Sequence, residues 1–179
     1  MHRLPQRYQY LLRAKFHPHL SHNPIFGSLK NYVYRKVAIS FSSSLYKFTP
    51  LRYFLELSYK GTLYHGWQRQ PNAVSVQQIL EEALGTLLGN EIQIIAAGRT
   101  DTGVHAKQMF AHFDADITAN QADDLAFRLN RFLPESIAIH KIHAVTASAH
   151  ARFDATSRSY EYHITKQKNP FSSEYAYFF

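Results

Sequence analysis

Cysteine is absent from the 179 residues, and this absence excludes several kinds of site. Without thiols the chain holds no disulfide, no thiolate zinc site and no cysteine nucleophile, and the composition fits a reducing compartment. We therefore expect a cytoplasmic protein. The chain also lacks a run of about 18 consecutive apolar residues, so the sequence predicts no membrane-spanning helix and no membrane partner.

Acidic residues are missing from residues 1–51, which hold eight Lys and Arg. Residues 52–179 hold the other 12 basic residues and all 13 acidic ones, so their formal charge is −1 although the whole chain carries +7. The excess of positive charge lies entirely in the first segment. Net charge therefore gives no support for nucleic-acid binding by the rest of the chain.

Residues 1–51 form an N-terminal extension that shows no sustained helix or strand period. Because it is rich in Arg and Ser and free of acids, it resembles a mitochondrial transit peptide, which would change the expected location. A disordered RNA-binding arm is a second interpretation. A third is upstream sequence translated from a misplaced start, with the true start near Leu51. We favour the third, and expect the extension to be disordered or non-native.

The chain from residue 52 alternates clearly between strand and helix patterns. Apolar residues recur at helical spacing after Ser75, which is a good N-cap, and Gly89 ends that pattern. The patterns predict two helices, at about 76–88 and 122–132, and four strands, at 53–59, 91–97, 105–113 and 136–145.

This β-α-β-β-α-β order predicts an α+β fold, a ferredoxin-like domain built on an antiparallel sheet. We place the N-terminal ferredoxin-like domain at residues 52–147. A further strand, expected at about 156–165, follows it. We therefore interpret residues 148–179 as the start of a second domain, only begun here.

One loop of this domain carries the residues best suited to catalysis. Gly98 and Gly103 bound a connection between two predicted strands, and Arg99 and Asp101 lie two positions apart within it. Loops on a rigid sheet often carry catalytic groups, and an Arg beside an Asp keeps the carboxylate ionised, as a nucleophile requires. The same residues also fit an ordinary glycine-bounded turn with a surface ion pair, which spacing alone favours.

Five blocks of sequence resemble the TruA family of pseudouridine synthases, and they follow one another along the chain in the order that the family has. The blocks are Gly98–Ala106 (GRTDTGVHA), Tyr59–Gln70, Ser75–Gln77, Leu129–Pro134 and His150–Phe153 with Arg158–Tyr162. The resemblance covers about residues 52–179. Departures from the family pattern are Lys60 for Asp, Thr102 for Ala, Gln108-Met109 for Gly-Gln, and Ala149 for Phe. Family members also continue beyond this point and complete a second domain.

The resemblance implies the pseudouridine synthase fold and an isomerase that converts uridine to pseudouridine at positions 38–40 of the tRNA anticodon stem-loop. It implies Asp101 as catalytic nucleophile, with Tyr160 and Arg99 binding the substrate. The reaction involves neither redox change nor net hydrolysis, so no cofactor and no metal are expected. It also implies a homodimer with tRNA across both subunits.

Other residues carry weaker expectations. Tyr160 and Tyr162 share a strand face, and spacing alone favours a core position for both; the resemblance reverses this for Tyr160 only. His140 and His143 are three apart on a strand, so we expect them on opposite faces and unable to share a metal. His105 is expected to position the signature loop, the name we give to the Gly98–Ala106 block. Candidate phosphate contacts are Arg128, Arg131, Arg152, Arg158, Lys166 and Lys168.

The alternative function is a catalytically inactive RNA-binding fragment of such an enzyme. It would retain the ferredoxin-like half and lack a closed site. An RRM-type module shares the strand order, but the aromatic RNP1 pattern of that module is absent from this sequence.

Overall fold

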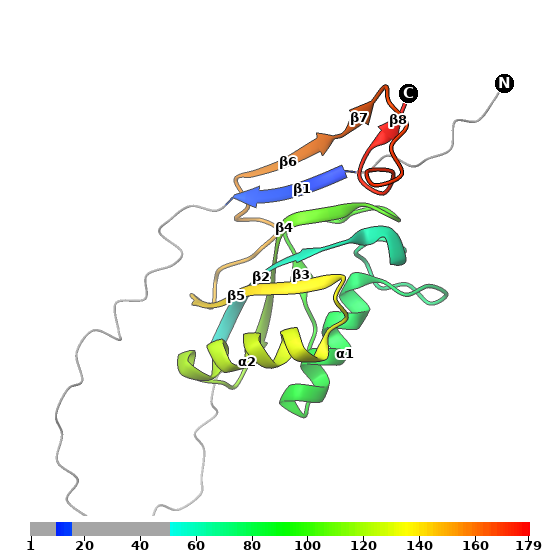
Figure 1. Ribbon diagram of the computed structural model, residues 1–179. Helices are drawn as coiled ribbons and strands as arrows, with labels where there is room; N and C mark the ends of the chain where they lie inside the picture. Colours follow the sequence, from blue (N-terminus) through cyan, green and yellow to red (C-terminus); the bar gives the residue numbers. More distant parts are fainter. Residues whose placement is uncertain (1–9, 16–50) are drawn as a thin grey trace, which may run out of the picture.

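The computed structural model describes residues 10–15 and 51–179, and its centre is an antiparallel sheet with two helices packed against one face (Figure 1). The domain comprises β2 (Leu51–Tyr59), α1 (Val76–Leu88), β3 (Ile95–Ala96), β4 (His105–Ala115), α2 (Ala119–Phe132) and β5 (Ile137–Val145). The strands lie in the order β5-β2-β4, with β3 also paired to β4. This is the ferredoxin-like order, so the predicted fold class is confirmed.

Capping residues set the start of both helices and the end of α1. The Ser75 hydroxyl accepts a hydrogen bond from the Gln78 amide at 3.2 Å, and Gly89 ends α1 in the left-handed region, as expected. Helix α2 begins three residues earlier than predicted, because Thr118 and Gln121 form a capping box. Neither of these two helices is long and apolar enough to cross a bilayer.

The core lies between the helices and the facing side of the sheet. Alternate residues of β2, namely Tyr53, Leu55 and Leu57, are fully enclosed, as the period of a strand requires. They pack against apolar positions of both helices and of the neighbouring strands, among them Leu80, Leu84, Met109, Phe113, Leu125 and Leu129. Each such leucine contributes about 2 kcal/mol through burial, so this layer fixes the strands that carry the site.

Two expectations about strands need correction. The strand predicted at 91–97 shrinks to β3, because only Ile95 and Ala96 pair with β4, opposite His112 and Ala111. The amide of Ile94 instead donates to the Glu81 side chain at 3.1 Å. A side chain on α1 thus replaces the sheet as hydrogen-bond partner there.

The expectation that His140 and His143 lie on opposite faces of the sheet is also wrong. A register shift between Glu56 and Leu57 leaves an extra residue on β5, and such a bulge reverses the alternation. Both imidazoles therefore contact the same face of β2: His140 lies 2.9 Å from the Ser58 hydroxyl and His143 lies 3.8 Å from the Glu56 carboxylate. Within residues 10–15 and 51–179, no three His, Asp or Glu residues gather as a metal site.

The sheet extends beyond the ferredoxin-like strands. β1 (Tyr10–Lys15) pairs in parallel with the start of β4, and β6 (Ser157–Tyr162) pairs antiparallel with β1. Two short strands, β7 (Ile164–Thr165) and β8 (Tyr177–Phe178), form a separate pair near the C-terminus. The extension was expected to be disordered or non-native, whereas six of its residues form β1. Leu51 begins β2, and residues 1–9 and 16–50 lie outside the described residues.

Candidate active site

The loop from Gly98 to Val104 joins β3 to β4 and presents Asp101 to solvent. The Val104 amide donates to the Asp101 carbonyl at 3.1 Å, which closes a turn, and Gly103 has a φ of 79° that other residues adopt only under strain. The backbone conformation of the loop therefore favours glycine at position 103. The turn leaves the Asp101 side chain outside the core.

A second segment, which we call the strap (residues 59–67, from the end of β2), holds this loop against the sheet. The Trp67 amide donates to the Thr100 carbonyl at 3.0 Å, and the Gly103 amide donates to the Tyr64 carbonyl at 3.2 Å. Gly66 approaches the loop so closely that a Cβ would overlap the Thr100 carbonyl oxygen. The blocks 59–70 and 98–106, distant in sequence, thus form one unit.

His105 directly follows the loop in the chain and contacts the strap. Its Nδ1 accepts the Gly61 amide at 3.0 Å and its Nε2 lies 3.1 Å from the Glu174 carbonyl, so the neutral ring with a proton on Nε2 satisfies both contacts. Burial lowers the pKa of His105, and the nearby Lys60 lowers it further against the Glu174 contacts. These contacts support the expected positioning role.

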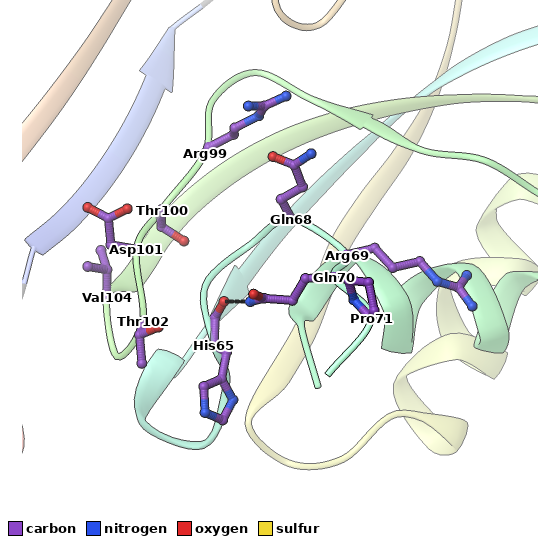
Figure 2. A pocket seen from close by; sticks show the side chains of 10 residues that line it. All are labelled: His65, Gln68, Arg69, Gln70, Pro71, Arg99, Thr100, Asp101, Thr102 and Val104. Carbon is purple, nitrogen blue, oxygen red and sulfur yellow. Dashed lines mark hydrogen bonds between the residues drawn. The ribbon is translucent and has the colours of Figure 1, made fainter. Parts of the chain in front are cut away.

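Asp101 lines an open pocket of about 850 Å³ (Figure 2). Its other lining residues come from the signature loop and from the strap and its continuation: His65, Gln68, Arg69, Gln70, Pro71, Arg99, Thr100, Thr102 and Val104. The predicted nucleophile is therefore accessible to a substrate. The pocket also offers amide, guanidinium and imidazole groups.

The expected ion pair between Arg99 and Asp101 does not form among the described residues. Figure 2 shows the guanidinium and the carboxylate pointing in different directions, and both side chains are exposed. Two residues on a turn diverge because the backbone rotates between them. The expected role of Arg99 in keeping the Asp101 carboxylate ionised therefore has no support in this geometry.

Tyr160 lies on β6 and lines a neighbouring pocket of about 490 Å³. Tyr160 is 47% exposed and Tyr162 is 58% exposed, so the core interpretation of these two tyrosines is wrong. Gln68 and Arg99 line both this pocket and the Asp101 pocket. Of the three predicted site residues, Arg99 therefore lines both pockets, Asp101 only the first and Tyr160 only the second.

Two of the candidate phosphate contacts also reach this second pocket. Arg158 donates to the Ala97 carbonyl at 2.7 Å and to the Arg152 carbonyl at 2.6 Å, so it ties the start of the signature loop to the segment after β5. Arg152 itself is exposed. The remaining candidates lie elsewhere: Arg128 and Arg131 on α2, and Lys166 and Lys168 after β7.

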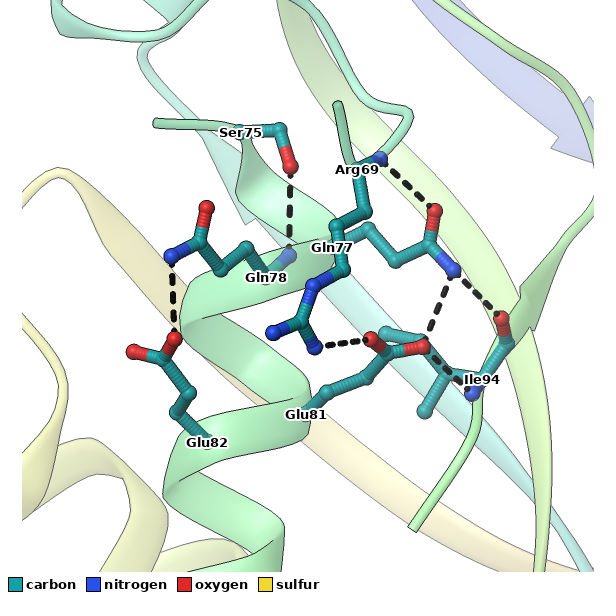
Figure 3. A network of polar contacts seen from close by, with 7 residues as sticks. All are labelled: Arg69, Ser75, Gln77, Gln78, Glu81, Glu82 and Ile94. Atoms are coloured by element: carbon teal, nitrogen blue, oxygen red, sulfur yellow. Dashed lines mark hydrogen bonds and ion pairs between the residues drawn. The ribbon is translucent and has the colours of Figure 1, made fainter. Parts of the chain in front are cut away.

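A polar network anchors the pocket wall to α1 (Figure 3). Gln77 accepts the Arg69 amide at 3.0 Å and donates to Glu81 at 2.9 Å. The Glu81 carboxylate also receives the Arg69 guanidinium at 3.3 Å and the Ile94 amide at 3.1 Å. Arg69 is thereby fixed from both its backbone and its side chain.

Sequence reasoning missed two residues of the site. Gln68 lines both pockets, but a single glutamine after a tryptophan carries no distinguishing pattern. Tyr59 was placed in the strand by its alternation with other core residues, which concealed that its hydroxyl lies 2.8 Å from the Thr100 hydroxyl. The structure alone reveals this contact of Tyr59, because Thr100 lies 41 residues away in the sequence.

The fold class and the loop together define the pseudouridine synthase fold. A family model described as tRNA pseudouridine synthase matches residues 57–154, more than half of the chain. The chain therefore belongs to the tRNA pseudouridine synthase family, as the five blocks predicted.

Curated relatives agree with this membership. The tRNA pseudouridine synthase A of Bacteroides fragilis is 52% identical over 126 residues, covering 70% of this chain and 50% of the relative. That of Parabacteroides distasonis shows the same identity and coverage. The enzyme of Pseudoalteromonas atlantica is 45% identical over 116 residues, covering 64% of this chain and 43% of the relative. The chain thus spans about half the length of the curated relatives it matches.

Proposed function

We propose that this protein isomerises uridine to pseudouridine at positions 38–40 of the tRNA anticodon stem-loop, with Asp101 as nucleophile. The observation that carries the proposal is an exposed carboxylate in an open pocket, on a loop that the strap holds in place. Relatives named tRNA pseudouridine synthase A support the substrate class.

The reaction requires the protein mainly to position the nucleophile and the extruded nucleotide. The C1′–N1 bond of uridine breaks, the base turns, a C1′–C5 bond forms, the C5 proton leaves and N1 gains a proton. No electron is gained or lost, so the reaction needs no redox partner. A carboxylate nucleophile must be ionised and reach the extruded nucleotide, and extrusion from the stack costs a few kcal/mol. Asp101 meets the need for access, since it is exposed and lines the pocket.

Tyr160 and Arg99 serve the extruded nucleotide in this proposal. The exposed ring of Tyr160 offers a face for stacking on uracil, worth about 1–3 kcal/mol. Arg99 lines both pockets, where its guanidinium can hold a backbone phosphate beside the opened strand. Arg152 extends this positive wall.

The proposal also covers assembly and location. We propose a homodimer that binds tRNA across both subunits and acts in the cytoplasm. A mitochondrial location is the alternative if residues 1–51 act as a transit peptide, because they combine basic residues with a lack of acids.

The test is pseudouridine formation by the purified chain on an unmodified tRNA transcript, mapped by chemical modification and primer-extension stops. We expect stops at positions 38–40, and a loss of at least about 1000-fold in Asp101→Asn, as for other removed nucleophiles. Asp123→Asn is the matched control, since Asp123 is an exposed carboxylate on α2 away from the pocket.

The rival function has a distinct outcome. Because the chain spans about half of its relatives, a non-catalytic RNA-binding fragment is the second candidate. Binding of the transcript without stops would establish that rival and overturn the enzyme assignment. Full activity in Asp101→Asn would refute the role of Asp101 alone.

A further inference from the structure

The end of β2 and the loop that carries Asp101 each contribute one hydroxyl to a buried pair that the proposed chemistry does not use. Tyr59 ends β2 and is only 4% exposed, and its hydroxyl lies 2.8 Å from that of Thr100, which is 8% exposed. Thr100 immediately precedes Asp101 in the chain. Buried hydroxyls are costly unless paired, so this hydrogen bond fixes the orientation of both side chains.

Thr100 is held through its backbone as well. Its carbonyl accepts the Trp67 amide at 3.0 Å, and Gly66 packs directly against the same carbonyl oxygen. The Trp67 ring lies against the Tyr59 ring, with centroids 6.0 Å apart. Tyr59 and Trp67 thus hold Thr100 by its side chain and by its main chain.

The side chain of Asp101 is not held by contacts of this kind. Among the described residues its carboxylate takes part in no hydrogen bond or ion pair, and Arg99 points elsewhere. Its place in the pocket therefore follows from the backbone of the residue before it. A nucleophile about 1 Å out of place can lose about 100-fold in rate, so whatever orients Thr100 also governs the reaction.

We propose that Tyr59 is a positioning residue for the reaction: through its hydrogen bond to Thr100 it orients Asp101 toward the pocket. This inference rests on the proposed function. Tyr59 does not touch the substrate, because it is buried and it is absent from the lining of the Asp101 pocket. Its contribution is to hold the loop in the geometry that attack requires.

The protonation state of Tyr59 makes this contact independent of ordinary pH. Burial raises the pKa of its hydroxyl well above the usual value, and the nearby Tyr160 phenol adds to the rise, against a smaller opposing effect of the Thr100 hydrogen bond. The hydroxyl therefore keeps its proton throughout the range in which an RNA enzyme is assayed.

Removing the Tyr59 hydroxyl alone is the direct experiment, and β2 supplies a matched control. In Tyr59→Phe we expect kcat to fall about 10- to 100-fold with KM within about twofold, because the pocket surface is unchanged. Tyr53→Phe removes another hydroxyl from the same strand, one that donates to the Ile117 carbonyl at 2.5 Å. We expect kcat of that control to stay within about twofold. An equal fall in both variants would overturn the proposal.

A double variant separates positioning from stability. Thr100→Val also removes the hydrogen bond but leaves the Tyr59 hydroxyl buried without its partner. Tyr59→Phe with Thr100→Val leaves neither hydroxyl unpaired, so stability should recover toward the parent. We expect kcat to stay as low as in the single variants, because the loop is still unanchored. Recovery of kcat together with stability would contradict a positioning role.

Amide hydrogen exchange gives a readout that needs no activity. The Gly103 and Val104 amides report the loop, since they donate to Tyr64 and Asp101. We expect both to exchange about 10-fold faster in Tyr59→Phe and not in Tyr53→Phe. Unchanged exchange would overturn the proposal. A parent chain that forms no pseudouridine would refute the proposed function instead, and exchange would then decide the anchoring of the loop by itself.

Discussion

Two regions of the molecule supply the site, and they are built differently. The ferredoxin-like region, residues 51–151, encloses side chains such as Tyr53, Leu55 and Leu57 completely. In the C-terminal segment, residues 152–179, every residue is exposed or half-buried. Asp101 comes from the first region and Tyr160 from the second.

This difference assigns different mechanical roles to the two site residues. Segments that bury little apolar surface open locally at small cost, whereas core strands open only with the whole domain. The loop that carries Asp101 is tied to the core by the strap, while β6 is exposed along nearly its whole length. The backbone that carries Asp101 is thus held more firmly than the strand that carries Tyr160.

The largest expected effect contrasts the two regions directly. Leu55→Ala should lower the free energy of unfolding by about 4 kcal/mol, because it leaves a cavity in a fully enclosed site. Ile164→Ala, at a position 68% exposed in the C-terminal segment, should lower it by less than about 0.5 kcal/mol. Urea unfolding of each variant measures this. Similar losses would mean that the C-terminal segment is packed as tightly as the domain.

A smaller effect tests whether the strap holds the loop rigidly. Gly66 has a φ of 83°, and an added Cβ would overlap the Thr100 carbonyl. Gly66→Ala should therefore cost about 3 kcal/mol through backbone strain and overpacking. Gly89→Ala is the control, because Gly89 has a φ of 76° with no atom within 4 Å of an added Cβ. It should cost about 1 kcal/mol by urea unfolding. Equal costs would show that the approach at Gly66 is unimportant.

A third effect, of about the same size, concerns the junction of the two regions, where the His112 ring accepts the Ala151 amide at 3.1 Å. Burial lowers the pKa of His112 to about 4, and the charges of Arg52 and His150 lower it further against those of Asp114 and Asp154. A histidine whose pKa falls on folding stabilises the protein above the unfolded pKa. That stability, about 3 kcal/mol, is lost as the pH falls from 6.5 through 4.

Urea unfolding between pH 7 and 4 measures this loss. His112→Gln cannot titrate and should flatten the pH dependence in that window, while His163→Gln, an exposed position in the C-terminal segment, should leave it unchanged. An unaltered pH dependence in His112→Gln would assign the acid sensitivity to other groups.

Much of the domain could be predicted from local patterns. The alternation in β2, the Ser75 cap and the Gly89 stop each depend on residues close together in sequence, and all three are present. Two predictions about strands failed because they depend on distant residues. The Glu81 side chain accepts the Ile94 amide, which the predicted strand would have paired within the sheet. A bulge on β5 places His140 on the same face of the sheet as His143. No local period contains that information.

The sequence by itself determined the β-α-β-β-α-β order, the family, and the glycine-bounded loop that carries Asp101, because periodicity, caps and turns act over a few residues. The tertiary structure decided that Arg99 turns away from Asp101, that β1 lies between β4 and β6, and that Tyr59 and Trp67 hold Thr100. These facts depend on contacts between residues far apart in the chain, and such contacts exist only once the sheet has brought the strands together.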